Sequence, residues 1–112
     1  MEVTVITGAQ GAGKNEKAYE VNGLGNRFIE FDADDFTKKS TWDGLENANS
    51  VIIDCVHSDK QIGQIQNLIQ RGNINYRIPY AKESKDYEIK KLIIISQWGI
   101  AGEFPTAKHI KL

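Results

Sequence analysis

The sequence is poor in cysteine, and it has neither an excess of charge nor a long apolar run. Its single cysteine, Cys55, cannot form a disulfide within the chain, and no Cys/His spacing resembles a zinc site, so a reducing compartment is expected. The net charge of −1 gives no global attraction to nucleic acid or anionic lipid, although a local basic patch is compatible with it. No stretch approaches the roughly 20 apolar residues of a membrane span. The N-terminus lacks the features of a signal peptide, so we expect a cytoplasmic protein that does not bind membranes.

The composition is that of a globular domain. Hydrophobic residues make up 40% and charged residues 26% of the 112 residues. This length is typical of one domain, and no repeat, low-complexity segment or linker divides it. We therefore expect a single domain over residues 1–112.

Short apolar runs alternate with helical patterns. Strands are expected at the following runs, the last of them weak: Val3–Thr7, Arg27–Phe31, Val51–Asp54, Leu92–Ile95 and His109–Leu112. Helices are expected at Asn15–Val21 and at Gln61–Gln70, the second with Asp59 as a plausible N-cap. The spacing of Ile62, Ile65, Leu68 and Ile69 gives this second helix one apolar face. This alternation predicts an α/β fold, a three-layer α/β/α sandwich with a mostly parallel central sheet.

Two segments are less clear. Thr41–Asn47 is long enough for one helical turn. Tyr76–Tyr80 and Tyr87–Ile89 flank the polar segment Ala81–Asp86, which leaves a hairpin and an ordered excursion as open alternatives.

A glycine-rich stretch lies between the first strand and the first helix. It matches the first seven positions of the motif G-x-x-x-x-G-K-[ST] and consists of Gly8, Ala9, Gln10, Gly11, Ala12, Gly13 and Lys14. In that motif successive amides turn inward around an anion, the helix N-terminus faces the phosphates, and the lysine reaches the β- and γ-phosphates. The alternative is a turn that merely connects two elements. The preceding strand, the following helix and the position of the lysine favour phosphate binding.

The eighth position of the motif is Asn15, where serine or threonine would place a hydroxyl on Mg²⁺. An amide oxygen can coordinate magnesium with different geometry, so Asn15 is a candidate metal ligand. Alternatively, Asn15 caps the first helix.

A second candidate metal ligand follows the third strand. Asp54 comes directly after Val51–Ile53, which is the pattern of a carboxylate that holds Mg²⁺ beside phosphates; an Asp that caps a loop is the alternative. The next residue, Cys55, is interpreted as a small core residue rather than a nucleophile. His57 lies close enough in sequence to face a γ-phosphate, but a catalytic role for it is the less favoured interpretation.

Polar residues also follow the second and fourth strands. Ser96 and Gln97 could contact a γ-phosphate or align water, or they could satisfy loop backbone groups; neither interpretation is favoured. For each aspartate of the acidic turn Asp32–Asp35, helix capping in a solvated turn is favoured over a role as metal ligand or base.

Lysines and tyrosines alternate between residues 76 and 91, which would suit contact with a nucleic acid backbone. Acidic residues are interspersed there, so a solvated face is favoured. The residues are Tyr76, Tyr80, Lys82, Lys85, Tyr87, Lys90 and Lys91.

The chain resembles a P-loop NTPase in three segments: Gly8–Lys14, Val51–Asp54 and Ile93–Gln97. More narrowly, it resembles the additional-strand division, which includes the AAA+ and RecA-like ATPases, and especially the small ATPases of phages and mobile elements. The resemblance implies the strand order 5-1-4-3-2 and ATP bound with Mg²⁺. The chain departs from it at Asn15 and at Cys55, which stands where a catalytic glutamate is common. It has no lid and no obvious arginine finger, although Arg27, Arg71 or Arg77 could act across a subunit interface.

These observations lead to an ATP-binding domain with weak or partner-dependent hydrolysis. Lys14 and the loop would hold the phosphates, Asp54 the metal, and Gln97 or Ser96 would sense the γ-phosphate. A protein partner or a homo-oligomer is compatible with this hypothesis. The alternatives are a nucleotide-binding regulatory module without turnover and, less favoured, a small kinase that uses Asp32 near its acceptor.

Overall fold

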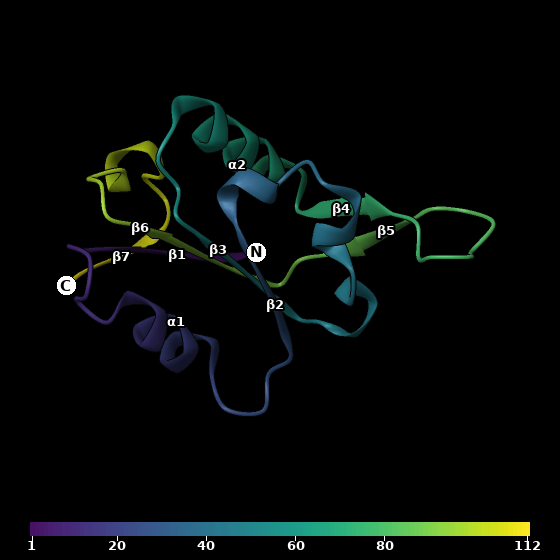
Figure 1. The fold of residues 1–112 in the computed structure, drawn as a ribbon, viewed down its shortest axis with the longest axis horizontal. Helices are drawn as coiled ribbons and strands as arrows, with labels where there is room; N and C mark the ends of the chain where they lie inside the picture. Colours follow the sequence, from purple (N-terminus) through teal and green to yellow (C-terminus); the bar gives the residue numbers. More distant parts are fainter.

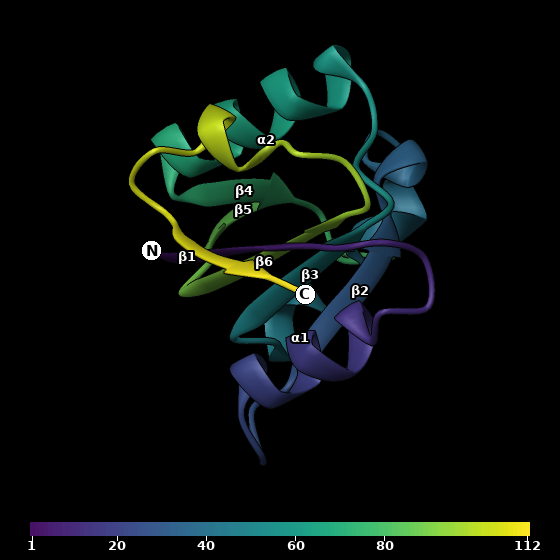
Figure 2. The same ribbon diagram turned by 90° about the vertical axis from the view of Figure 1, so that its left-hand side faces the viewer.

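The computed structural model describes all residues from Met1 to Leu112, and a five-stranded sheet forms its middle layer. Helix α1 (Lys14–Asn22) lies on one face of the sheet and helix α2 (Asp59–Arg71) on the other, as Figures 1 and 2 show. The predicted three-layer α/β arrangement is therefore confirmed. No helix is both long and apolar enough to cross a membrane.

The strands of the sheet are parallel throughout. Their spatial order is β2 (Phe28–Asp32), β3 (Ser50–Asp54), β6 (Lys91–Ser96), β1 (Glu2–Thr7) and β7 (Lys108–Lys111). When these five strands are numbered along the chain, the order is the expected 5-1-4-3-2. Because β6 pairs with both β1 and β3, the carboxyl ends of all three strands meet at one edge of the sheet.

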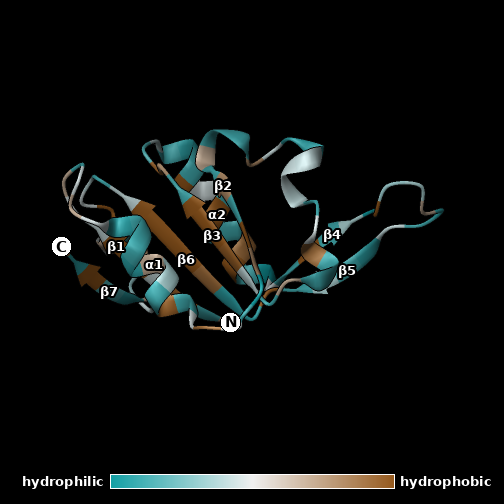
Figure 3. Ribbon diagram, turned by 60° about the horizontal axis from the view of Figure 1, so that its bottom comes forward, coloured by the Kyte–Doolittle hydropathy of each residue, from teal (hydrophilic) through white to brown (hydrophobic).

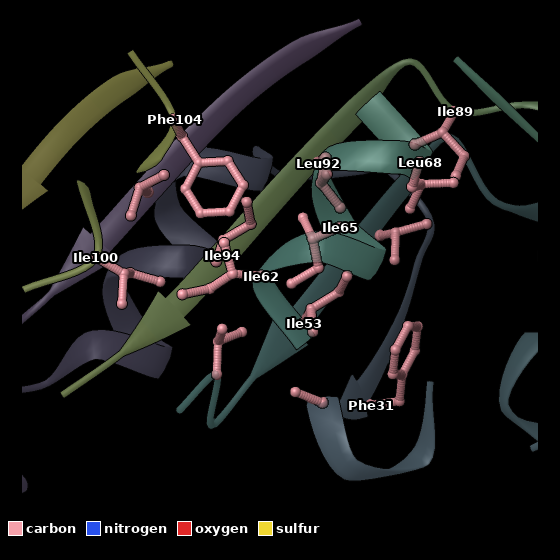
Figure 4. Close-up of a cluster of buried hydrophobic side chains, with 14 of the residues drawn as sticks. Phe31, Ile53, Ile62, Ile65, Leu68, Ile89, Leu92, Ile94, Ile100 and Phe104 are labelled. Carbon is pink, nitrogen blue, oxygen red and sulfur yellow. The ribbon is translucent and has the colours of Figure 1, made fainter. Parts of the chain in front are cut away.

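The α2 face holds the larger core. Sixteen buried residues form one cluster, in which α2 contributes Ile62, Ile65 and Leu68. Figure 4 shows these side chains against Ile53 of β3 and against Leu92 and Ile94 of β6. The spacing of the apolar residues predicted this buried side of α2, and burying such side chains stabilises the fold by roughly 1.5–3 kcal/mol each.

The α1 face holds a much smaller core of five buried residues: Ile6, Ala18, Ile52, Ile93 and Ile95. Helix α1 is mostly polar and buries only Ala18 and Asn22. Its last carbonyls, those of Val21 and Asn22, accept hydrogen bonds from Lys91 Nζ at 3.2 and 3.3 Å. Lys91 therefore joins β6 to the C-terminal end of α1, where its positive charge also complements the helix dipole.

The expected N-cap of α2 is wrong by one residue. Ser58, in extended conformation, is the cap: its hydroxyl accepts from the amide of Gln61, and the Gln61 side chain accepts from the Ser58 amide. This reciprocal pair is a capping box, in which the hydroxyl and the longer amide side chain each satisfy an exposed amide. Asp59 instead lies in the first helical turn, where its negative charge faces the positive end of the dipole.

The two unclear segments are regular. Lys39–Trp42 and Leu45–Asn47 form separate 3₁₀ turns instead of one helical turn across Thr41–Asn47. Strands β4 (Asn73–Tyr76) and β5 (Lys85–Glu88) pair antiparallel, so the hairpin is the correct alternative. The hairpin projects from the body of the molecule (Figure 1) and is largely hydrophilic, whereas β3 and β6 are hydrophobic along their length (Figure 3).

Candidate functional site

The loop Gly8–Gly13 joins the carboxyl end of β1 to the start of α1. Gly11 and Gly13 have φ angles of 82° and 88°, which is the left-handed region that glycine adopts without strain. Gly8 is confined differently: a Cβ there would lie 3.1 Å from the carbonyl oxygen of Leu112. The glycines are therefore required by the course of the loop.

The loop leaves several amides free. Gln10, Gly11 and Gly13 donate from their backbone nitrogens to no carbonyl, and the first amides of α1 have no partner within the helix. Lys14 Nζ donates to the carbonyl of Ala9 at 2.8 Å, which holds the ammonium against the loop. Free amides, a helix N-terminus and a lysine thus lie together, and this combination attracts anions.

A cavity of about 660 Å³ lies beside the loop, within the usual size of a small-molecule site. Its walls come from the loop and α1, from the end of β3 and from the end of β6. The lining residues are Gln10, Gly11, Lys14, Asn15, Asp54, Cys55, Val56, His57, Ser96, Gln97 and Trp98.

Asn15 does not cap α1, contrary to one of the two interpretations of its role. The N-cap is Gly13, which has no side chain. The Asn15 amide nitrogen instead donates to Asp54 Oδ2 at 3.0 Å and to Glu30 Oε2 at 3.2 Å. Carboxylates only accept hydrogen bonds, so the NH₂ group must face them and the amide oxygen points the other way.

Glu30 is the residue that sequence reasoning missed. It lies in the middle of β2 and also accepts from the hydroxyl of Tyr19 at 2.7 Å, which raises the pKa of Tyr19. Its register partner is Ile52, two residues before Asp54, so Glu30 and Asp54 share the α1 face of the sheet. A charged residue within an otherwise apolar strand was the available signal.

Cys55 is exposed, so its interpretation as a core residue is wrong. Its φ of 58° turns the chain sharply just after Asp54, whose Oδ1 accepts from the Cys55 amide at 2.7 Å. Partial desolvation, together with the nearby carboxylates of Asp54 and Asp32, raises the pKa of the thiol to about 11. The thiol is therefore protonated at neutral pH and is a poor nucleophile.

Ser96, the last residue of β6, and Gln97, which follows it, differ in burial. Ser96 is buried; its hydroxyl donates to the carbonyl of Val56 at 2.5 Å and accepts from the amide of Trp98 at 3.0 Å. It therefore ties the β6 end to the β3 end, as the backbone-satisfying interpretation expects. Gln97 is exposed and lines the cavity, where its amide is accessible to a ligand.

The acidic turn after β2 contacts the turn after β3. Asp32 caps the 3₁₀ turn Ala33–Asp35 by accepting from the Asp34 amide. The Asp34 carboxylate lies 3.0 Å from His57 Nε2 and accepts from Gln61 Nε2 at 2.6 Å. The capping interpretation is therefore correct for Asp32, whereas the Asp34 side chain contacts His57 and Gln61.

The lysines and tyrosines between residues 76 and 91 do not all face solvent: Lys82, Lys85 and Lys90 are exposed, whereas Lys91 is only partly exposed. Lys91 lies under α1, while Tyr80 is fully exposed in the loop that joins β4 to β5. The Tyr76 hydroxyl donates to Asp43, which raises the pKa of Tyr76 to about 12.

The predicted phosphate and metal residues gather at one edge of the sheet. Lys14, Asn15, Asp54 and Gln97 all line the cavity. Within the loop, Gln10 and Gly11 line it too, while Gly8, Ala9, Ala12 and Gly13 shape the turn without facing the cavity.

The donor set suits a magnesium ion. Oxygens of Asp54 and Glu30 both accept from the Asn15 amide nitrogen, and of the two carboxylates only Asp54 lines the cavity, where a cation would meet it. No group of at least three His, Cys, Asp or Glu side chains is arranged to hold a metal. Mg²⁺ does not require one, because it keeps several waters and is bound through one or two carboxylates and the phosphates of its substrate.

No protein-family model matches the chain, and no curated protein matches it in sequence. Solved structures do match its fold. NtrX from Brucella abortus, solved in complex with ATP, aligns with a TM-score of 0.59 over 98% of this chain and 32% of NtrX, at 15% identity. The apo C-terminal region of NrS-1 aligns with a TM-score of 0.54 over 85% of this chain and 23% of the other, at 16% identity.

The chain therefore spans about a third or less of each neighbour. At these identities the likeness shows a shared fold. The fold is P-loop NTPase-like.

Proposed function

We propose that the protein binds a nucleoside triphosphate, expected to be ATP, at Gly8–Asn15 and hydrolyses it weakly or only with a partner. One observation carries the proposal: the free amides of the loop, the N-terminus of α1 and the Lys14 ammonium surround one side of a 660 Å³ cavity. The phosphates would lie in this loop, where amides and the helix dipole favour negative charge. That NtrX was solved with ATP supports a nucleotide as the ligand.

Asp54, the carboxylate that lines the cavity, would hold Mg²⁺, which neutralises charge on the β- and γ-phosphates when it is bound. The Asn15 amide would rotate to offer its oxygen, or move aside, because its NH₂ group faces both carboxylates in the present arrangement. Gln97 would contact the γ-phosphate from the β6 side of the cavity. Turnover is expected to be slow because the amide of Asn15 competes with the metal for Asp54.

No arginine lines the cavity. An arginine from a second copy of this chain or from another protein would supply positive charge in the transition state, as arginine fingers do. This would make hydrolysis dependent on a partner.

Calorimetric titration with Mg-ATP tests the binding. Lys14→Ala is expected to weaken ATP affinity roughly 10- to 150-fold, since hydrogen bonds to charged groups contribute about 1.5–3 kcal/mol. Lys17→Ala is the matched control, because Lys17 lies on the same helix but pairs with Glu20 at the surface. Equal ATP affinity of Lys14→Ala and the unmodified protein would reject the proposal.

A nucleotide-binding module without turnover is the second candidate, and the hydrogen bond from Asn15 to Asp54 favours it. Steady-state phosphate release with Mg-ATP separates the two candidates. If Asn15→Thr raises the rate of phosphate release and leaves ATP affinity unchanged, the site is an ATPase whose rate is limited by the residue at position 15. A rate of zero in both proteins would favour the module.

A further inference from the structure

We propose that His57 is the general base for ATP hydrolysis, held in place by Asp34 and Gln61; this inference rests on the proposed function. Position makes His57 available. It follows the sharp turn at Cys55 and lines the same cavity as Lys14 and Asp54. The imidazole thus lies on the wall that continues from the metal-binding end of β3.

The other side chains of this wall do not supply a base. Cys55 offers only a thiol, which is a weak hydrogen-bond donor and not an oxygen or nitrogen base. Asp54 is engaged by the Asn15 amide and by the Cys55 amide, and it is assigned to the metal. Lys14 and Gln97 are not proton acceptors at neutral pH. His57 is the remaining basic group.

Two partners orient the ring. Asp34 Oδ1 lies 3.0 Å from His57 Nε2 and accepts from Gln61 Nε2 at 2.6 Å. Gln61 is 7% exposed, and its side-chain oxygen accepts from the amides of His57 and Ser58 at 2.9 and 3.3 Å. A buried side chain at the start of α2 therefore fixes both the backbone of His57 and the carboxylate beside its ring. Asp34 and Gln61 act through His57, as positioning residues.

These contacts also select the tautomer. The Asp34 carboxylate only accepts hydrogen bonds and lies nearer to His57 Nε2, at 3.0 Å, than the Gln61 amide nitrogen does, at 3.4 Å, so the proton of a neutral His57 ring is assigned to Nε2. Nδ1 then carries the lone pair and can take a proton. A carboxylate that holds an imidazole in one tautomer is the arrangement by which histidine bases are oriented in catalysis.

Water can reach the ring from a second cavity. His57 also lines a polar space of about 260 Å³ behind it, together with Asp34, Ser58 and Gln61. His57 therefore lines both the nucleotide cavity and a smaller polar one. Its side chain is 49% exposed, so neither side closes it off.

In the proposed step, a water oxygen attacks the γ-phosphorus, and the bond from that phosphorus to the β–γ bridging oxygen breaks. The water gives one proton to His57 Nδ1, and ADP leaves with the electron pair of the broken bond. Phosphate and ADP depart, and the imidazolium then loses its proton to solvent. No oxidant, reductant or further co-reactant is needed.

Single-turnover hydrolysis of Mg-ATP by the full chain tests this role. His57→Ala is expected to lower the rate at least about 100-fold, the lower end for general-base catalysis, with ATP affinity within twofold of the unmodified protein. Added imidazole should restore part of the rate, which a structural role would not produce. His57→Gln keeps a donor for Asp34 but lacks a base, and it should be equally slow.

Asp34→Asn should lower the rate less than His57→Ala, and imidazole should not restore it. His109→Ala is the control, because His109 lies on β7 and contacts the carbonyl of Phe104. A wild-type rate in His57→Ala or His57→Gln, or no rescue by imidazole, overturns the inference and leaves nucleotide binding standing.

Calorimetry on the same samples separates the two proposals. ATP binding by the unmodified protein, with a hydrolysis rate that His57→Ala leaves unchanged, rejects His57 as a base only. Absence of ATP binding by the unmodified protein rejects the proposed function, and this inference falls with it.

Discussion

The two faces of the sheet differ in how much apolar side chain they bury. The α2 face buries sixteen residues in one cluster, and α2 brings a continuous apolar side to it. The α1 face buries five residues; α1 contributes Ala18 to them, and its partly buried Val21 packs against the cluster. A polar helix on a thin core cannot supply most of the stability, since burial of apolar surface is the main favourable term in folding.

Polar groups replace the missing core on the α1 face. Asn15 links the first turn of α1 to β2 and β3, and Lys91 holds the last turn. The buried Asn22 Oδ1 has no hydrogen-bond partner, a state that costs stability. The lesson is that the face carrying the candidate site is fastened by polar contacts, while the opposite face supplies the hydrophobic stability.

The sharpest test of this comparison uses neighbouring residues of β6. Ile94 and Ile93 are both fully buried, but Ile94 belongs to the large cluster and Ile93 to the small one. Ile94→Ala is expected to lower the free energy of unfolding by about 4 kcal/mol and Ile93→Ala by about 2 kcal/mol, because the larger core collapses less around a cavity. Urea unfolding measures both, and equal losses would break the comparison.

A smaller effect is expected at the polar link of the α1 face. Asn15→Ala removes the donor shared by Asp54 and Glu30 and leaves two carboxylates facing each other. The free energy of unfolding should fall by about 1–2 kcal/mol, because two hydrogen bonds of roughly 0.5–1 kcal/mol each are lost. Asn67→Ala on the exposed side of α2 is the control and should not be destabilising. A neutral Asn15→Ala would show that this link does not stabilise the fold.

The smallest effect concerns the other end of α1. Lys91→Met removes the donor to the carbonyls of Val21 and Asn22 and should cost roughly 0.3–1 kcal/mol, as for charges at helix ends. Hydrogen exchange should become faster at amides of α1 and stay the same in α2. Lys90→Met is the matched control, since Lys90 is exposed. Faster exchange throughout the sheet would contradict a local role for Lys91.

Much of the fold could be predicted from local patterns. The β-branched runs marked the strands of the sheet, and the spacing of Ile62, Ile65 and Leu68 marked the buried side of α2. Boundaries moved by a residue or so, as for the cap at Ser58, because serine and aspartate are both good caps and only the backbone conformation distinguishes them.

The candidate site was predictable only in part. Gly8–Lys14 and Asp54 were identifiable because each is defined by its neighbours in sequence. The contact of Glu30 with Asn15 and the pairing of Asp34 with His57 were not, since they join residues 15 and 23 positions apart on different elements.

By itself, the sequence determined the alternation of strands and helices, the glycines of the loop, and a lysine at the start of a helix. Backbone preferences and hydrophobic periodicity act over a few residues, so they can be read locally. The tertiary structure alone decided that Asn15 faces two carboxylates, that Cys55 is exposed, and that His57 meets Asp34 beside the cavity. Those outcomes depend on which strands become neighbours in the sheet, and parallel strands bring distant residues together at one edge.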